Sequence, residues 1–250
     1  MTQIKIKPEE LAKKALLILR GKFDPEHARQ VQRYFKEEVK SYGLTAPEIR
    51  SLASELYQTI KSEWRLKDAI RLCDMLFPEP ELEAKSVAAL ILIRYKRDLP
   101  KEFISRVKEW LAANYLNNWA SVDGFCPEVM GELLEKYPEL IAEIKTWTMY
   151  PNRWVKRASA VSFLKLSKKE EFLPTIYEIA TRLFSVDDDL IEKATGWLLR
   201  EAGKRDMGRL ERFLLRHGLA IPRTTLRYAI ERFGGKKRKE LLMKTRSRRS

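Results

Sequence analysis

Apolar side chains recur along this chain with the 3.6-residue period of helices, and short breaks, commonly at Pro or Gly, separate the periodic stretches. No segment alternates apolar and polar residues between turn residues, as a strand would. The pattern therefore predicts an all-α chain, with Asp24 and Thr224 as helix caps. A proline near the start of a helix loses no backbone hydrogen bond, and four prolines stand at such places: Pro25, Pro47, Pro100 and Pro222.

A repeat runs through the middle of the chain. Four segments spaced 36 residues apart each begin with a polar residue and end, three places later, with Ala or Gly: 85–88, 121–124, 157–160 and 193–196. A small side chain that recurs on helices marks a close approach of neighbouring helices, and this spacing suits a two-helix unit. The repeat predicts an α-solenoid of the HEAT type, whose inner helices line an extended concave surface.

The positive charge is concentrated toward the end of the chain. The net charge is +14, yet residues 1–150 carry 24 basic and 23 acidic side chains, whereas residues 234–250 carry 8 basic and 1 acidic. We expect one domain over residues 1–233 and a flexible basic tail over residues 234–250. The uneven positive face favours a phosphate-bearing partner, with nucleic acid ahead of an anionic membrane surface.

Composition excludes several classes of protein. An apolar fraction of 44% is enough for a core, so the chain is not intrinsically disordered. The longest early apolar run, residues 15–19, is far shorter than the ~20 residues that cross a bilayer, so we expect a cytoplasmic protein, nucleoid-associated in a prokaryote. Cys73 and Cys126 lack a CxxC or His partner and are predicted to be buried thiols. We expect no metal and no cofactor.

Asp123 and Trp119 stand just ahead of an apolar-periodic helix. Asp123 could be a carboxylate at the helix start, where the dipole and free N–H groups favour it, and Trp119 could belong to the core. If the four repeat segments are equivalent helices, Asp123 takes a position that faces away from Arg157. This conflict eases if residues 117–121 form a loop and the helix starts near Asp123.

Arg157 follows two other cations, Arg153 and Lys156, at the head of a predicted helix, where the dipole disfavours positive charge. A phosphate partner would offset this cost, although Arg153 and Lys156 could equally form a solvated face. Arg157 is the first residue of its repeat segment, and Trp197 takes the fifth position of the next one. Positions one and five are four apart, hence on one helical face. Taken alone, Trp197 is typical of a helix core.

Several blocks in order resemble the AlkD-type DNA glycosylases, which are HEAT-like-repeat proteins that remove alkylated bases. They include Tyr42-Gly-Leu-Thr-Ala-Pro-Glu-Ile-Arg50, Asn118-Trp-Ala-Ser-Val-Asp123, Trp154-Val-Lys-Arg157-Ala and Lys193-Ala-Thr-Gly-Trp197. The resemblance covers most of the chain and implies a right-handed α-solenoid with a concave groove for duplex DNA. The family's active-site Trp, Asp, Arg and Trp fall on Trp119, Asp123, Arg157 and Trp197.

The resemblance also implies a mechanism without base flipping. A cationic alkylated purine such as 3-methyladenine or 7-methylguanine leaves as a neutral base, so the catalyst must stabilise positive charge on the deoxyribose. Asp123 is the expected carboxylate, and it could also orient the attacking water. Thr45 replaces a family Gln, which affects lesion preference. The further residues expected to contact DNA are Arg153, Lys156, Lys193, Arg200, Arg223, Arg227, Tyr34 and Thr45.

Two other functions are compatible with a HEAT-type frame. One is a non-catalytic protein that binds damaged or branched nucleic acid, and the other is a protein-binding scaffold with no salt-sensitive affinity for DNA. The joint presence of Trp119, Asp123, Arg157 and Trp197 favours the enzyme. We expect it to act as a monomer on double-stranded DNA, away from membranes.

Overall fold

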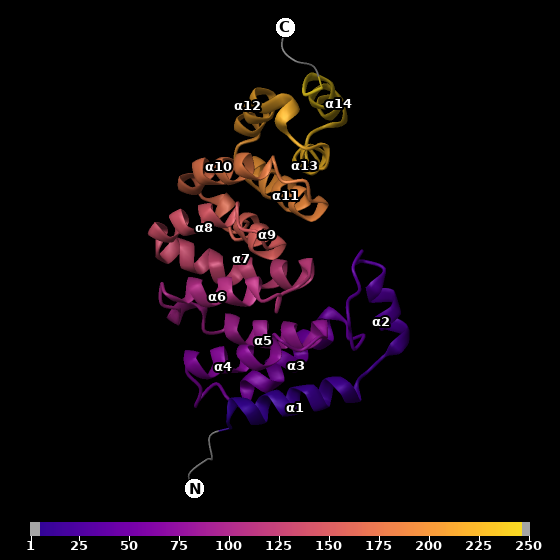
Figure 1. Ribbon diagram of the computed structural model, residues 1–250, viewed down its shortest axis with the longest axis vertical. Coiled ribbons are helices and arrows are strands. Elements are labelled where there is room, and N and C mark those ends of the chain that lie inside the picture. The colour runs from indigo at the N-terminus through magenta and orange to yellow at the C-terminus, as the bar shows by residue number, and fades with distance from the viewer. Residues whose placement is uncertain (1–5, 247–250) are drawn as a thin grey trace. The chain divides into compact units, whose positions relative to one another are not determined.

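The structure is a computed structural model that describes residues 6–246, and within this range it contains α-helices and short 3-10 helices but no strand (Figure 1). One isolated parallel bridge joins Lys40 to Glu81. The described residues divide into two compact units, and the division falls inside α7, between Phe125 and Cys126. The predicted all-α class is confirmed, whereas a single domain over residues 1–233 stays a prediction.

Unit 1 is built from helices that pack against one another in pairs. Within it α4 packs against α1 and α5, and α3 packs against α5. Phe77 is fully buried at the centre and meets the rings of Trp110 and Phe125 edge-on, at 4.9 and 5.5 Å. The helices of this unit are α1 (Pro8–Gly21), α2 (Pro25–Gln32), α3 (Ala46–Gln58), α4 (Leu66–Leu76), α5 (Leu82–Ile93), α6 (Phe103–Ala112) and the start of α7 (Trp119–Lys136).

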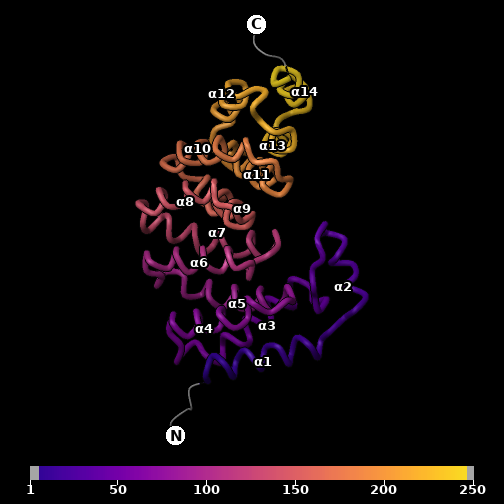
Figure 2. The backbone as a smooth tube through the Cα atoms, in the orientation of Figure 1, coloured from indigo at the N-terminus to yellow at the C-terminus, as the bar shows by residue number. Residues whose placement is uncertain are grey.

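Unit 2 repeats this packing. Helix α9 packs against α8 and α11, α11 packs against α10 and α13, and α14 lies on α12. The backbone path in Figure 2 shows α9, α11 and α13 following one another as stacked neighbours, each joined by the connecting helix between them. After the end of α7, the helices are α8 (Ile141–Trp147), α9 (Arg153–Val161), α10 (Leu173–Leu183), α11 (Asp189–Arg205), α12 (Met207–His217), α13 (Arg223–Ala229) and α14 (Gly235–Lys244).

The 36-residue repeat falls on alternate helices, α5, α7, α9 and α11. Its small residue marks a close approach at three of the four places. Ala88 and Ala160 are fully buried, and a Cβ added to Gly196 would lie 2.5 Å from Tyr228 Cβ on α13. Gly124 is different, because a Cβ there would meet nothing within 4 Å. The repeat therefore marks helix contacts in α5, α9 and α11 and an open space at α7.

Helix caps and termini partly follow the sequence. Asp24 caps α2 as predicted, with its carboxylate 2.9 Å from the backbone N of Glu26 and of His27. The prediction for Thr224 is wrong, because this residue lies inside α13 and Pro222 occupies the N-cap position. Cys73 and Cys126 are buried free thiols, as expected. Within the described residues, no helix has the length and apolar character needed to span a membrane.

The described part of the basic tail is mostly helical. Residues Gly235–Lys244 form α14, whose Leu241 is fully buried. Arg223 of α13 donates to Thr245 Oγ1 at 3.2 Å and to the carbonyl of Leu242 at 3.4 Å. The expectation of flexibility is therefore corrected for residues 235–246, and residues 247–250 lie outside the described range.

Candidate active site

The first turn of α7 carries two of the expected site residues. The helix begins at Trp119, and the Asn118 side chain serves as its cap, because Asn118 Oδ1 accepts from the Ser121 backbone N at 2.9 Å and from Ser121 Oγ at 3.0 Å. The alternative in which residues 117–121 form a loop and the helix starts near Asp123 is therefore excluded. Asp123 lies one turn inside the helix, four residues after Trp119 and on the same face. Its carboxylate is not the cap.

An aromatic side chain that the sequence reading missed covers one face of Trp119. The rings of Phe35 and Trp119 are stacked, with centroids 5.0 Å apart and planes inclined by 22°. Gln32 holds the loop that carries Phe35: its Nε2 donates to the Glu37 carbonyl at 2.8 Å, and its Oε1 accepts from Val39 N at 2.9 Å. Phe35 therefore covers one side of the indole.

The other two expected contacts of unit 1 lie on the segments that flank this loop. Tyr34, beside Phe35, is 76% exposed. Thr45 is the N-cap of α3, and its hydroxyl donates to Glu48 Oε2 at 2.7 Å. This hydrogen bond and a second one from the Thr45 backbone N lower the pKa of Glu48. The structure therefore gives Thr45 a capping role, and its contact with DNA stays a prediction.

A buried carboxylate fixes the chain that leads to Thr45. Glu83 of α5 is 1% exposed and receives four hydrogen bonds from one loop. Gly43 in this loop has a positive φ of 81°, and a Cβ there would lie 2.2 Å from the Asp24 carbonyl, so glycine is required. The donors to Glu83 are Ser41 Oγ at 2.6 Å and the backbone N–H groups of Tyr42 at 2.9 Å, Gly43 at 3.0 Å and Leu44 at 3.2 Å.

In unit 2, Arg157 lies on α9 and is only 5% exposed. Its Nη1 donates to the carbonyl of Leu190 in the first turn of α11. The side chain thus ties α9 to the start of α11, two turns before Trp197. Trp197 is half-buried on α11, where it follows Lys193 by one turn and shares its face. Helix α9 packs on α11, and the shared face of Arg157 and Trp197 that the repeat predicts stays a prediction.

Most of the expected DNA-binding cations of unit 2 hold protein partners. Arg153 Nε lies 2.6 Å from Asp188 Oδ2, and Lys193 Nζ lies 2.8 Å from Asp189 Oδ2. Arg200 pairs with Glu231. Arg223 is bound to the α14 region as described above, and its pKa is lowered, mainly by burial.

Two cations differ from these. Within residues 6–246 no partner binds the side chain of Lys156, which is half-buried, or of Arg227, which is exposed. These two can accept a phosphate without breaking an existing bond. The described part of the tail adds further exposed cations to Lys156 and Arg227. Among them are Lys236, Arg238 and Lys239 on α14.

The expected site draws Trp119 and Asp123 from unit 1, and Arg157 and Trp197 from unit 2. Each pair is placed within its own unit, and their convergence around one ligand stays a prediction. Chemically, unit 1 offers a carboxylate beside an indole, and unit 2 offers an indole with cations on the neighbouring turns. Among residues 6–246 no three His, Cys, Asp or Glu side chains gather as metal ligands would.

Comparison with known proteins gives the family. Residues 16–233 match the family described as DNA alkylation repair enzyme. The chain belongs to this family. A predicted DNA alkylation repair enzyme from Enterococcus faecalis has the same fold, with a TM-score of 0.74 and 19% sequence identity over 86% of this chain and 98% of that chain. No curated protein matches the sequence.

Membership of the DNA alkylation repair enzymes assigns this chain a role in DNA repair, and DNA as its substrate. The family match spans both units and includes Trp119, Asp123, Arg157 and Trp197. It also covers the loop that carries Phe35 and ends before α14. The basic helix α14 therefore lies outside the matched region.

Proposed function

We propose that this DNA repair enzyme is a DNA-alkylpurine N-glycosylase, which hydrolyses the N-glycosidic bond of cationic alkylated purines in duplex DNA. The observation that carries the proposal is the pairing of Asp123 with Trp119 on one face of α7. Asn118 caps this helix, so Asp123 does not serve as its N-cap. A carboxylate beside a half-exposed indole suits a substrate that develops positive charge.

The reaction needs charge stabilisation more than proton transfer to the leaving group. A purine alkylated at N3 or N7 carries positive charge, and it departs as a neutral base when the glycosidic bond breaks. Positive charge then develops on the deoxyribose, where the Asp123 carboxylate stabilises the transition state more than the ground state. The same carboxylate orients the water that adds to the sugar carbon and accepts its proton.

The indoles would hold the cationic nucleotide. Phe35 covers one face of Trp119, so the nucleotide approaches the opposite face. The negative quadrupole of each indole attracts a cation, worth ~0.5 to 2 kcal/mol depending on desolvation. Trp197 supplies the second indole in this proposal. Because the lesion is contacted through its sugar and phosphate, the base would stay unflipped.

Unit 2 would bind the DNA backbone. Lys156 and Arg227 have no competing partner within the described residues, so they are the strongest candidates for phosphate contacts. Arg157 would reach a phosphate while it keeps its bond to the Leu190 carbonyl, because a guanidinium has five donors. The ion pairs of Arg153 and Lys193, whose cationic side chains are 42% and 33% exposed, cost little to exchange for a phosphate.

The test uses a duplex that contains one 7-methylguanine. The protein is incubated with it, and abasic sites are cleaved with alkali. We expect strand cleavage by the wild type. For Asp123→Asn the cleavage rate should fall at least about 100-fold. Asp98→Asn is the matched control, because it removes one exposed carboxylate from the same unit.

DNA binding is measured on the same samples. Retained binding with lost cleavage supports a catalytic Asp123. Binding without cleavage by the wild type would instead indicate a non-catalytic protein that recognises damaged DNA. A uracil-containing duplex provides a second control, since uracil leaves as an anion that no group in the proposed site protonates. Release of uracil as fast as 7-methylguanine would contradict the mechanism.

A further inference from the structure

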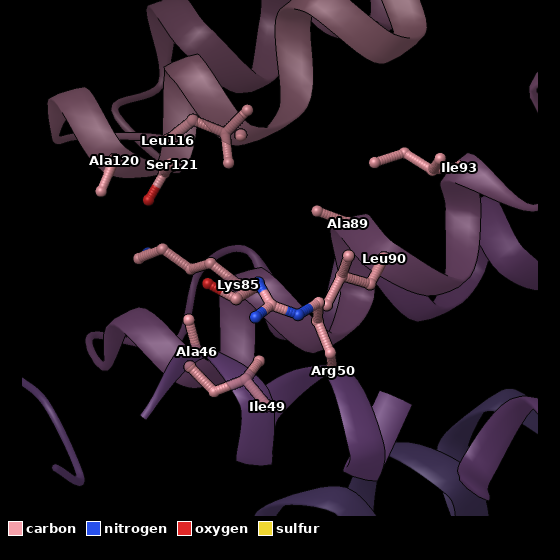
Figure 3. A pocket seen from close by; sticks show the side chains of 12 residues that line it. Ala46, Ile49, Arg50, Lys85, Ala89, Leu90, Ile93, Leu116, Ala120 and Ser121 are labelled. Atoms are coloured by element: carbon pink, nitrogen blue, oxygen red, sulfur yellow. The ribbon is translucent and has the colours of Figure 1, made fainter. Parts of the chain in front are cut away.

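A hollow of about 260 Å³ lies in unit 1 between α3, α5 and the start of α7 (Figure 3). Its walls are mainly apolar and include Ile49, Leu90, Ile93 and Leu116. Gly124 also lines it, at the place where an added Cβ would meet nothing within 4 Å. The volume lies near the lower end of small-molecule sites, about 300 Å³, which limits an occupant to one small ring system.

Two serine hydroxyls in the wall have their protons already engaged. Ser86 Oγ donates to the Leu82 carbonyl at 2.9 Å, and Ser121 Oγ donates to Asn118 Oδ1 at 3.0 Å. Each hydroxyl oxygen therefore presents lone pairs and no proton to the hollow. An occupant is satisfied here if it brings N–H donors, such as an amino group on a ring.

Lys85 lines the hollow and gives it a positive charge. Its Nζ donates to the carbonyls of Phe77 at 2.6 Å and Tyr115 at 2.8 Å, so two of its three N–H groups are already engaged. Burial lowers the pKa of Lys85 to about 8, which leaves it mostly protonated at neutral pH. A neutral ring is therefore favoured over a cationic one.

Arg50 provides a site for an anion at the edge of the hollow. It is exposed, and within residues 6–246 no group binds its guanidinium. Figure 3 shows the Arg50 side chain extending from α3 toward Lys85. A phosphate bound there could be attached to a ring in the hollow, because a free guanidinium forms strong paired hydrogen bonds with phosphate.

We propose that this hollow binds a neutral nucleobase that carries an amino group, with the phosphate of its nucleotide on Arg50. The ring would pack between Ile49, Leu90 and Leu116, and its amino group would donate to Ser86 Oγ or Ser121 Oγ. This site is distinct from the face of α7 that carries Trp119 and Asp123, and it takes an uncharged base. It does not depend on glycosylase activity.

Two sources could supply this chemistry, a free nucleotide or an unstacked nucleotide of DNA. The probe is the 5′-monophosphate of 2-aminopurine deoxyriboside, whose fluorescence changes when its ring leaves water for an apolar site. We expect a saturable fluorescence change with the full-length protein, with dAMP competing at least about tenfold better than dTMP, which has no amino group. A single-stranded oligonucleotide with one 2-aminopurine tests the DNA source, and its fluorescence would rise if the nucleotide unstacks into the hollow, because neighbouring bases would no longer quench it.

Arg50→Gln separates the phosphate contact from the ring contact. We expect it to weaken the nucleotide about tenfold while the free base 2-aminopurine binds unchanged. Arg97→Gln is the matched control, since it removes an exposed cation from the same unit and leaves both affinities unchanged. Because Arg50 is exposed, its substitution does not threaten folding.

Ala89→Leu tests the hollow itself. Ala89 lines it, so a leucine there fills the space and should abolish the fluorescence change of both the free base and the nucleotide. Ala113→Leu, at an exposed position, is the control for added bulk. Unchanged binding in Ala89→Leu, or equal competition by dTMP and dAMP, would overturn the proposal. No alkylated DNA is present, so this result is independent of the glycosylase test.

Discussion

Replacing Glu83 with alanine should loosen the chain segment that leads into α3. The carboxylate is buried and accepts hydrogen bonds from Ser41 Oγ and from the backbone N–H groups of residues 42–44. A hydrogen bond to a charged group contributes ~1.5 to 3 kcal/mol, and burying the charge opposes part of that sum. Water that enters the space would satisfy some of the freed N–H groups. The expected loss of unfolding free energy is therefore ~3 to 5 kcal/mol.

The assay is urea denaturation of the whole chain, combined with hydrogen exchange of residues 41–46. Exchange is needed because two compact units do not guarantee a two-state transition. Glu83→Gln should lose less, since its amide oxygen still accepts, and Glu102→Ala, at an exposed position, should change little. A loss below about 1 kcal/mol for Glu83→Ala, with exchange in the loop unchanged, would refute the anchoring role.

Three further predictions follow from packing and charge. Gly196→Ala should lower the free energy of unfolding, measured in urea, by ~1 to 3 kcal/mol, because its Cβ would press against Tyr228. Gly124→Ala should be neutral or stabilising, and equal effects of the two substitutions would contradict the packing. The lowered pKa of Lys85, about 8, means that the folded chain binds fewer protons than the unfolded chain above that pH, so wild-type stability relative to Lys85→Met should rise from about pH 8 to 10.5. A constant difference between the two proteins over that range would count against a buried charge. Replacing three exposed cations of α14, Lys236, Arg238 and Lys239, with glutamine should lower the slope of log affinity against log salt by up to about 3. An unchanged slope would exclude these three residues from the DNA interface.

The fold was the most predictable property, because it depends on local periodicity. Apolar spacing identifies helices from neighbouring residues, and the 36-residue repeat locates four equivalent helices. The start of α7 was misjudged because Asn118 and Asp123 both belong to the residue types that cap helices, and only the hydrogen bond to Ser121 separates them. The order of the basic tail was also missed, since its charge obscured the buried anchors, Leu241 and Thr245.

The site was less predictable, because its decisive contacts join residues far apart in the chain. Phe35 stacks on Trp119 across 84 positions, and Arg157 reaches the Leu190 carbonyl across 33. Neither pair leaves a periodic signal. The salt bridge between Arg153 and Asp188 likewise depends on how α9 meets the start of α11. Sequence reasoning identified the residue types, whereas their partners required the three-dimensional arrangement.

The most direct test of the glycosylase proposal is to detect the released base. Excess protein is incubated with a duplex that carries one 7-methylguanine, and the small-molecule fraction is analysed by liquid chromatography with mass spectrometry. The account predicts free 7-methylguanine in a one-to-one ratio with abasic duplex, and none from Asp123→Asn. A wild-type protein that binds this duplex and releases no base would contradict it.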